Sequence, residues 1–175
     1  QVWERLTGPP EGESLAQDRP RLNRDTVNFE TLAALPDGTL GREYVRFLSD
    51  NHITPDAFHN DPAFEDDRAV FMSARMRQTH DLWHVITGFS PDVHGEIVLQ
   101  AFTYGQTGAP SAWLIGVLGV LRYGKLRPAF IRECMRAYRL GKAAPFFGAV
   151  YWEKRWERPV RELRAELGLP VVGIA

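Results

Sequence analysis

Two histidines and two carboxylates in this sequence have the residue types and the spacing of a metal site. His80, Asp81 and His84 lie close together, and Glu96 follows twelve residues after the second histidine. In a helix, His80 and His84 lie one turn apart on one face, with Asp81 on the same side. Two imidazoles at positions i and i+4 can bind one metal ion. Glu96 is expected on the next helix, after a short turn, so the sequence predicts one metal site with these four ligands.

The donor atoms indicate which ion this site would bind. Two nitrogen and two oxygen ligands suit Zn²⁺ best, and Mg²⁺, Mn²⁺ and Fe²⁺ are the alternatives. The competing interpretation is a pair of core histidines beside solvated acids. We favour the metal because Asp81 and Glu96, set among apolar helices, are costly to bury without a cation or hydrogen bonds. The remaining histidines are predicted to lie outside the site: His52, His59 and His94.

Four polar residues near the predicted ligands are candidates for binding a substrate. Arg77 lies one turn before the histidine pair and can hold an anionic group, or form an ordinary surface salt bridge. A polar stripe on the expected helix of Glu96 shares the face of that residue: Gln100, Thr103 and Thr107. Such a stripe faces solvent or lines a pocket. Its continuity with a predicted ligand favours a pocket wall that leads away from the metal.

The elements that must position these residues are predicted to be helices. Residues 1–24 are rich in proline and are predicted to form an irregular arm, and residues 25–175 a single all-α domain, a helical bundle. No alternating apolar pattern of useful length indicates a strand. The principal helices are expected at residues 66–88, 91–107, 111–123, 128–140 and 159–167. The helix at 111–123 is apolar on all sides, which predicts a position at the buried centre of the bundle.

Composition narrows the function classes. The chain has 175 residues, of which 44% are hydrophobic and 25% charged, which excludes an extended disordered chain and a fibrous protein. A single cysteine indicates a reducing, cytoplasmic compartment. Neither an export signal nor an apolar run of about 20 residues is visible, so no transmembrane helix is expected.

Charge is distributed unevenly along the chain. Residues 1–121 carry 9 basic and 17 acidic side chains, whereas residues 122–175 carry 12 and 5. Nucleic acid is not an expected partner, because the overall balance is acidic and no nucleic-acid-binding signature is present. The amphipathic helix at 128–140 is instead predicted to lie on an anionic membrane surface, with a solvated face as the alternative. Its arginines would contact the head groups: Arg132, Arg136 and Arg139.

The spaced motif resembles the metal signature of the ubiquinone (coenzyme Q) biosynthesis protein 4 family. The motif is His80-Asp81-x-x-His84, followed after eleven residues by Glu96. Other segments resemble the same family: Leu35-Pro36-Asp37-Gly38-Thr39-Leu40-Gly41-Arg42-Glu43-Tyr44, Gly95-Glu96 and Gln106-Thr107-Gly108-Ala109-Pro110. The resemblance covers the chain from about residue 30 to the C-terminus.

This resemblance implies an all-α fold and zinc bound by the four residues of the motif, which would be catalytic through the metal. It implies a lyase of coenzyme Q synthesis that removes the carboxylate from C1 of a polyprenylated 4-hydroxybenzoate derivative, with or without hydroxylation there. It also implies an isoprenoid lipid in a helical groove and partners among the other quinone biosynthesis enzymes. The expected location is peripheral on the inner membrane of a bacterium, or on the matrix side in a mitochondrion. A homodimer is left open.

Two other functions fit the same residues. In zinc peptidases the acid of a His-Glu-x-x-His helix is a general base and not a ligand, so a zinc hydrolase is expected if Asp81 does not contact the metal. A non-catalytic scaffold that binds isoprenoid lipid is expected if four protein ligands leave the ion no open position. In the hydrolase Asp81 is a general base and not a metal ligand, whereas in the scaffold the metal is structural.

Overall fold

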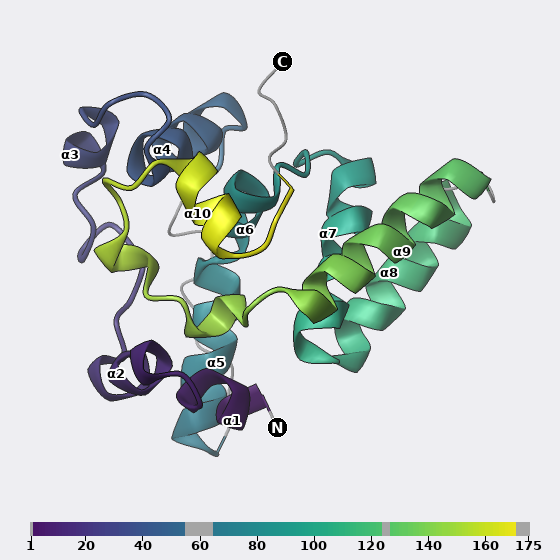
Figure 1. Cartoon of the computed structure of the whole chain (residues 1–175), viewed down its shortest axis with the longest axis horizontal. Helices are drawn as coiled ribbons and strands as arrows, with labels where there is room; N and C mark the ends of the chain where they lie inside the picture. Colours follow the sequence, from purple (N-terminus) through teal and green to yellow (C-terminus); the bar gives the residue numbers. More distant parts are fainter. Residues whose placement is uncertain (1, 55–64, 124–126, 171–175) are drawn as a thin grey trace. The chain divides into compact units, whose positions relative to one another are not determined.

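The protein is predominantly helical in the part of the chain that the computed structural model describes, which is residues 2–54, 65–123 and 127–170 (Figure 1). This confirms the all-α prediction. Within those residues there is no β-strand, and only an isolated bridge pairs Thr39 with Pro159. None of the helices found there has the length and apolarity needed to span a membrane.

The chain forms two compact units. The first comprises residues 1–86 and 146–163, and the second comprises residues 87–145 and 164–175. The first unit holds α1 (Val2–Thr7), α2 (Pro10–Asp18), α3 (Phe29–Ala33), α4 (Leu40–Asp50), α5 (Asp67–Gln78), nearly all of α6 (His80–Thr87), η1 (Phe147–Ala149) and η2 (Trp152–Lys154). The second holds α7 (Val93–Thr107), α8 (Pro110–Tyr123) and α9 (Pro128–Ala143), and α10 (Val160–Glu166) begins in the first and ends in the second. The prediction of one domain over residues 25–175 stays a prediction.

The N-terminal arm is helical, which corrects the prediction of an irregular segment at residues 1–24. α1 and α2 occupy most of it because Pro10 stands at the first position of α2, where proline starts a helix and does not break one. Leu6 and Leu15 are fully buried in a cluster with Phe71 and Phe146. The arm is therefore part of the core of the first unit.

The helix predicted at residues 66–88 is two helices, α5 and α6, which meet at Thr79. The hydroxyl of Thr79 donates to the carbonyl oxygen of Arg75 at 2.8 Å, and the residue caps the C-terminus of α5. α6 consequently starts at His80. Gly88, with φ of 78°, follows the end of α6 in the left-handed conformation that the sequence predicts for a stop there.

Buried polar contacts fasten α5 to the C-terminal part of the first unit. The Arg75 side chain is 1% exposed, pairs with Glu153 and donates to the carbonyl oxygen of Val150 at 2.9 Å. The family-like segment at residues 35–44 serves the same unit. Leu40 donates its N–H to the carbonyl oxygen of Arg158 at 2.9 Å, just before α10. These bonds position the helices around α6.

In the second unit α7 packs against both α8 and α9, and glycines let α7 and α9 approach closely. A Cβ added at Gly141 would lie 2.2 Å from the carbonyl oxygen of Phe102, and one added at Gly105 would lie 2.4 Å from that of Tyr138. Gln106, fully buried, donates to the carbonyl oxygen of Gly141 at 2.6 Å. Backbone contact therefore joins these two helices.

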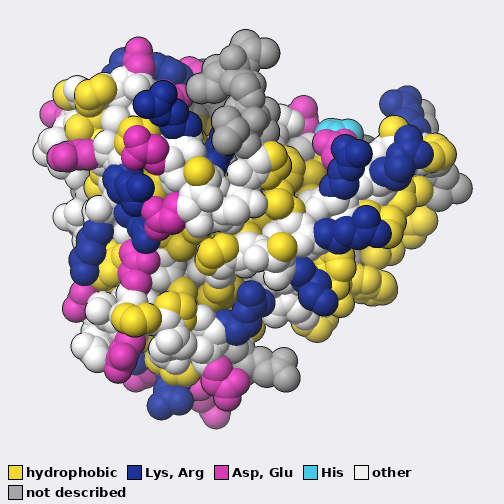
Figure 2. All heavy atoms as spheres, in the orientation of Figure 1, with side chains coloured by type: hydrophobic (Ala, Val, Ile, Leu, Met, Phe, Trp, Pro, Cys, Tyr) yellow, Lys and Arg dark blue, Asp and Glu magenta, His cyan; other side chains and the backbone are white. Residues whose placement is uncertain are grey.

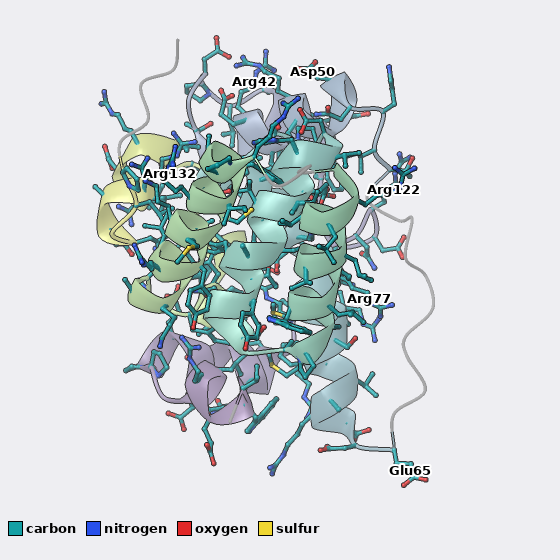
Figure 3. The ribbon with its side chains drawn as sticks, turned by 90° about the vertical axis from the view of Figure 1, so that its right-hand side faces the viewer. Arg42, Asp50, Glu65, Arg77, Arg122 and Arg132 are labelled. Carbon is teal, nitrogen blue, oxygen red and sulfur yellow. The ribbon has the colours of Figure 1, made fainter. Side chains whose placement is uncertain are left out.

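The position of α8 corrects the prediction of a buried central helix. It packs on α7 along the side of Gly116 and Gly119, and much of its remaining surface is exposed (Figure 2). Five large apolar side chains are at least half exposed: Trp113 51%, Leu114 50%, Ile115 53%, Leu118 54% and Leu121 62%. The centre of the three helices belongs to α7, as Figure 3 shows from the side. An apolar pattern on all sides of this helix therefore does not correspond to burial, because no described residue covers the outer face of α8.

Candidate metal centre

The predicted histidine pair is formed by the first turn of α6. His80 and His84 present ring nitrogens within 4.8 Å of each other, and their ring centroids are 5.0 Å apart at an angle of 72°. His84 is 2% exposed, and its ring stacks on that of Phe47 of α4 at a centroid distance of 5.5 Å. The helix therefore aims two imidazoles at one point, as the i and i+4 spacing predicts.

Asp81 lies beside this pair. Its Oδ1 is 3.5 Å from Nδ1 of His80, and both side chains are partly exposed. Two ligands of a tetrahedral zinc ion, with bonds of about 2.0–2.1 Å, lie about 3.4 Å apart. The measured separation therefore fits a carboxylate and an imidazole that share an ion. Asp81 thus contacts His80, and its part as a metal ligand beside the two imidazoles stays a prediction.

Apolar packing fixes the other sides of α6. Leu82, Trp83 and Ile86 are at most 1% exposed, and the Trp83 ring meets that of Phe147 edge to face at 5.5 Å. Because these side chains interdigitate with the core, α6 has little freedom to rotate. The core therefore fixes the side of α6 from which His80 and His84 project.

Glu96 lies in the second unit, in the first turn of α7, where it is partly buried. Asp92 precedes this turn, and its carboxylate accepts the N–H of Gly95 at 2.8 Å. That hydrogen bond is the largest cause that holds the pKa of Asp92 below its usual value. Asp92 therefore fixes the start of α7 as an N-cap. The part of Glu96 in a metal site stays a prediction.

The predicted substrate-binding residues have different local roles. Thr107 donates its hydroxyl to the Thr103 carbonyl oxygen at 2.8 Å and accepts the N–H of Ala109 at 3.0 Å, so it shapes the end of α7. The hydroxyl of Thr103 is buried, with no hydrogen-bond partner in the described residues. Gln100 is partly buried on the same helix. Arg77 of α5 is also partly buried, and its Nε donates to the Ser73 carbonyl oxygen at 3.4 Å.

The histidines predicted to lie outside the site behave differently from the pair. His94 is exposed, and its Nε2 is 2.8 Å from a carboxylate oxygen of Glu133. His52 is exposed at the end of α4. His59 lies outside the described residues.

An apolar groove runs along the second unit between α8 and α9, over α7. Its volume is about 340 Å³. It is lined by Ile97, Ala101 and Tyr104 of α7, by Ala112, Trp113, Gly116, Val117, Val120 and Leu121 of α8, and by Ile131, Cys134, Met135 and Tyr138 of α9. Burial raises the pKa of the Cys134 thiol to about 11, as expected where a charged thiolate is poorly solvated. The family resemblance implies a helical groove for an isoprenoid lipid, and no sequence pattern predicted the α9 wall of the groove found here.

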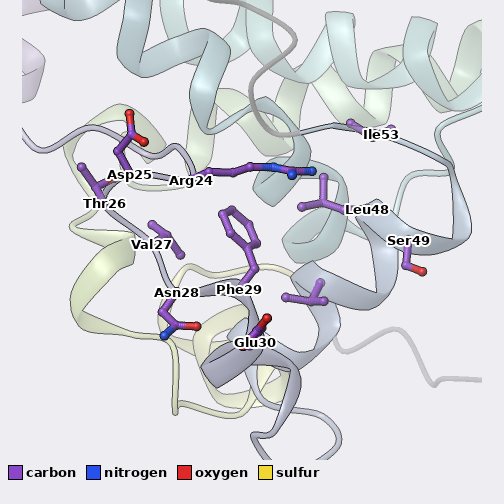
Figure 4. Close-up of a pocket in the computed structure, with 11 residues that line it drawn as sticks. Arg24, Asp25, Thr26, Val27, Asn28, Phe29, Glu30, Leu48, Ser49 and Ile53 are labelled. Atoms are coloured by element: carbon purple, nitrogen blue, oxygen red, sulfur yellow. The ribbon is translucent and has the colours of Figure 1, made fainter.

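A second cavity, of about 720 Å³, lies in the first unit, and no feature of the sequence predicted it (Figure 4). Residues 24–30 form one side, and α4 and Ile53 form the other. Figure 4 shows the side chain of Arg24 extended above the ring of Phe29 toward Leu48. The lining joins one continuous segment to residues of α4 and includes charged, polar and apolar types, so no spacing motif could have revealed the cavity.

The fold and the site together define the class of this protein. It is an all-α protein with a candidate metal centre, for which α6 presents two imidazoles and a carboxylate. The family described as coenzyme Q (ubiquinone) biosynthesis protein Coq4 matches it over residues 1–172. The chain belongs to this family, and the match includes the N-terminal arm that the sequence resemblance left out.

Known relatives agree with this assignment. The ubiquinone biosynthesis protein COQ4 homolog, mitochondrial, of Danio rerio is 36% identical over 168 residues, which are 95% of this chain and 62% of that protein. Its Homo sapiens counterpart is 36% identical over 162 residues, 91% of this chain and 61% of that protein. The chain thus spans about three-fifths of these curated relatives. A crystal structure of a ubiquinone biosynthesis protein from Nostoc punctiforme matches with a TM-score of 0.76 and 31% identity, covering 95% of this chain and 79% of that one.

Proposed function

We propose that this protein is a metal-dependent lyase that removes the C1 carboxylate from a polyprenylated 4-hydroxybenzoate derivative in coenzyme Q biosynthesis. The observation that carries the proposal is the histidine pair of α6, in which His84 is almost fully buried and Asp81 lies beside His80. An imidazole and a carboxylate placed in this way among apolar side chains are typical of metal ligands. Membership of the Coq4 family supports the choice of pathway.

In this proposal the ligands of one Zn²⁺ are His80, Asp81, His84 and Glu96. Mg²⁺, Mn²⁺ and Fe²⁺ are the alternatives. The ion supplies a Lewis acid that stabilises negative charge on an oxygen of the substrate's head group. Because the apolar contacts of α6 fix its rotation, the imidazoles keep their orientation as the charge develops.

The other polar residues would orient the head group. The reaction breaks the bond between C1 and the carboxyl carbon, releases CO₂, leaves the electron pair on the ring and adds a proton at C1. Arg77 would hold the carboxylate before this bond breaks. Gln100 and Thr103 lie on the face of α7 that carries Glu96, and the buried Thr103 hydroxyl would donate to the phenol oxygen.

The groove between α8 and α9 would hold the polyprenyl tail. Its lining is apolar, and a chain of methyl-branched units binds by displacing water from such a surface. We further propose other quinone biosynthesis enzymes as partners, and a peripheral location on the bacterial inner membrane or its mitochondrial equivalent. Mass spectrometry of lipids carried by the natively purified protein tests the groove. Protein that neither carries nor binds isoprenoid lipid would remove this part of the proposal.

The activity is tested in cells that lack their own C1 decarboxylase. Wild type and a His52→Ala control should restore quinone, whereas Asp81→Ala and Glu96→Ala should leave the carboxylated intermediate to accumulate, with folded protein present. Equal rescue by folded, metal-free variants would show that the protein is a scaffold. Absence of rescue by wild type would contradict the assigned reaction. An Asp81→Ala protein that keeps its metal but loses activity would point to the general base of a hydrolase.

A further inference from the structure

The ring of Phe47, a residue of α4, lies against the ring of the buried His84. The two ring centroids are 5.5 Å apart and the ring planes differ by only 19°, which is the geometry of an offset stack. His80 meets the same imidazole at a steep angle, 72°, with its centroid 5.0 Å away. Phe47 therefore covers one face of an imidazole whose nitrogens are predicted to bind the ion.

The packing of α6 does not by itself determine the plane of this imidazole. Leu82, Trp83 and Ile86 fix the side of the helix from which His84 projects. The last torsion of a histidine side chain has broad preferences, however, so the ring turns about its Cβ–Cγ bond unless a neighbour prevents it. A ring nitrogen binds a metal with a lone pair that lies in the ring plane, so the orientation of that plane matters. The stack on Phe47 restricts this torsion.

Helix α4 is itself anchored, so Phe47 has a fixed position. Tyr44, one turn before Phe47, is 1% exposed, and its ring stacks on that of Trp156 with centroids 5.8 Å apart and planes 10° apart. At the start of the helix, the N–H of Gly41 donates to the carbonyl oxygen of Trp156 at 2.9 Å. Because α4 is held to the segment around Trp156 by a ring contact and a backbone bond, Phe47 resists displacement when the imidazole turns.

We propose that Phe47 is a positioning residue for the metal centre, which holds the ring of His84 in the plane from which a nitrogen binds the ion. The inference rests on the proposed function, because it requires the metal, but it adds a residue outside the ligand motif. A ring that is already oriented loses less conformational freedom when the ion binds, so the stack should raise metal affinity. Phe47 acts only through His84 and supplies no ligand atom.

Zinc affinity of three purified variants, measured by competition with a chromophoric chelator, tests this role. Phe47→Leu keeps an apolar side chain but removes the flat ring, and it should weaken zinc binding about tenfold, the low end for residues that orient a ligand. Phe47→Tyr keeps the ring and should retain wild-type affinity. Phe29→Leu is the matched control: its ring is partly buried like that of Phe47 and lies 6.2 Å from Tyr44 of the same helix. This control should bind zinc as wild type does.

Two further readouts separate positioning from a general loss of packing. With Co²⁺ in place of Zn²⁺, the visible absorption band reports ligand geometry, and it should change in Phe47→Leu but not in Phe47→Tyr or Phe29→Leu. Without metal, Phe47→Leu and Phe29→Leu should lower the melting temperature by similar amounts, because each removes a partly buried ring.

Two results would overturn the positioning role. One is a Phe47→Leu protein with the zinc affinity and the Co²⁺ spectrum of wild type, which would leave the metal centre and the proposed function standing. The other is a Phe29→Leu protein that loses as much zinc affinity as Phe47→Leu, since the effect would then come from packing in general. The expected pattern in a wild-type protein that fails to restore quinone in cells would instead support the role of Phe47 and contradict the proposed reaction.

Discussion

Helices α6 and α8 are both rich in apolar residues, yet they depart from ordinary burial in opposite ways. α6 buries a histidine, His84, to 2% exposure among large apolar side chains. α8 leaves Leu118 and Leu121 more than half exposed while its glycines face α7. In each helix one group of residues departs from the usual preference of its type for the interior or the surface of a protein.

The difference between the two helices shows where to look for function. A buried imidazole needs a polar partner, and the adjacent Asp81 makes a metal ion a suitable one. An exposed row of leucines on one helix marks a surface that fits an apolar partner. The same composition thus indicates an internal site in one helix and an external surface in the other.

The largest expected difference between α6 and α8 is the loss in the free energy of unfolding when one leucine of each helix is truncated to alanine. Leu82→Ala in α6 removes a fully buried side chain and should lower the free energy of unfolding by about 2–5 kcal/mol. Leu118→Ala in α8 should lower it by about 1 kcal/mol or less. Chemical denaturation of both variants gives the comparison. Equal losses would mean that α8 is covered in solution and would break the contrast.

Glycine substitutions test how tightly the neighbours of α8 are packed. Gly141→Ala in α9 places a Cβ against the Phe102 carbonyl oxygen and should cost about 1–3 kcal/mol of stability. Gly116→Ala in α8 meets only an ordinary contact with Gln100 and should be neutral or stabilise by up to about 1 kcal/mol. Thermal unfolding of both proteins measures this. A destabilised Gly116→Ala protein would show that α8 is packed as closely as α9.

The smallest expected effect concerns the start of α7, the helix on which α8 rests. Asp92→Ala removes an N-cap and should cost about 1 kcal/mol at neutral pH. The hydrogen bond from Gly95 lowers the Asp92 pKa from 3.8, so its stabilising effect is complete above that value and is lost as pH falls through the lower, folded-state pKa. The stability difference between wild type and variant should therefore shrink as the pH falls below 3.8. A difference that is constant with pH would argue against a charged cap.

Local patterns were predictable from the sequence. The histidine pair follows from helical periodicity, and Gly88 and Gly108 end helices as expected because they adopt positive φ. The boundary at Thr79 was not predictable, since it depends on a side-chain bond to the Arg75 carbonyl oxygen and involves neither glycine nor proline. The prolines of residues 1–24 led to the wrong prediction of an irregular arm, because Pro10 starts the helix α2.

Placement was harder to predict than local structure. The apolar pattern of residues 111–123 indicated a buried helix, but burial depends on how many neighbours the fold supplies, and α7 holds the centre. Gln106 was read only as part of a family-like segment, although its buried side chain ties α7 to the end of α9. The α9 wall of the groove, with Cys134, comes from residues about 30 positions away from α7 in sequence. Such contacts leave no periodic signal.

The zinc content of purified variants tests the central claim most directly. Wild type, and the exposed-histidine controls His52→Ala and His94→Ala, should bind one zinc ion per chain in elemental analysis and calorimetric titration. His84→Phe retains a ring that can stack on Phe47, so it should stay folded, bind no zinc and lose the rise in melting temperature that zinc produces in wild type. Wild type that holds no metal, or His84→Phe that binds zinc as tightly as wild type, would contradict a metal centre on α6.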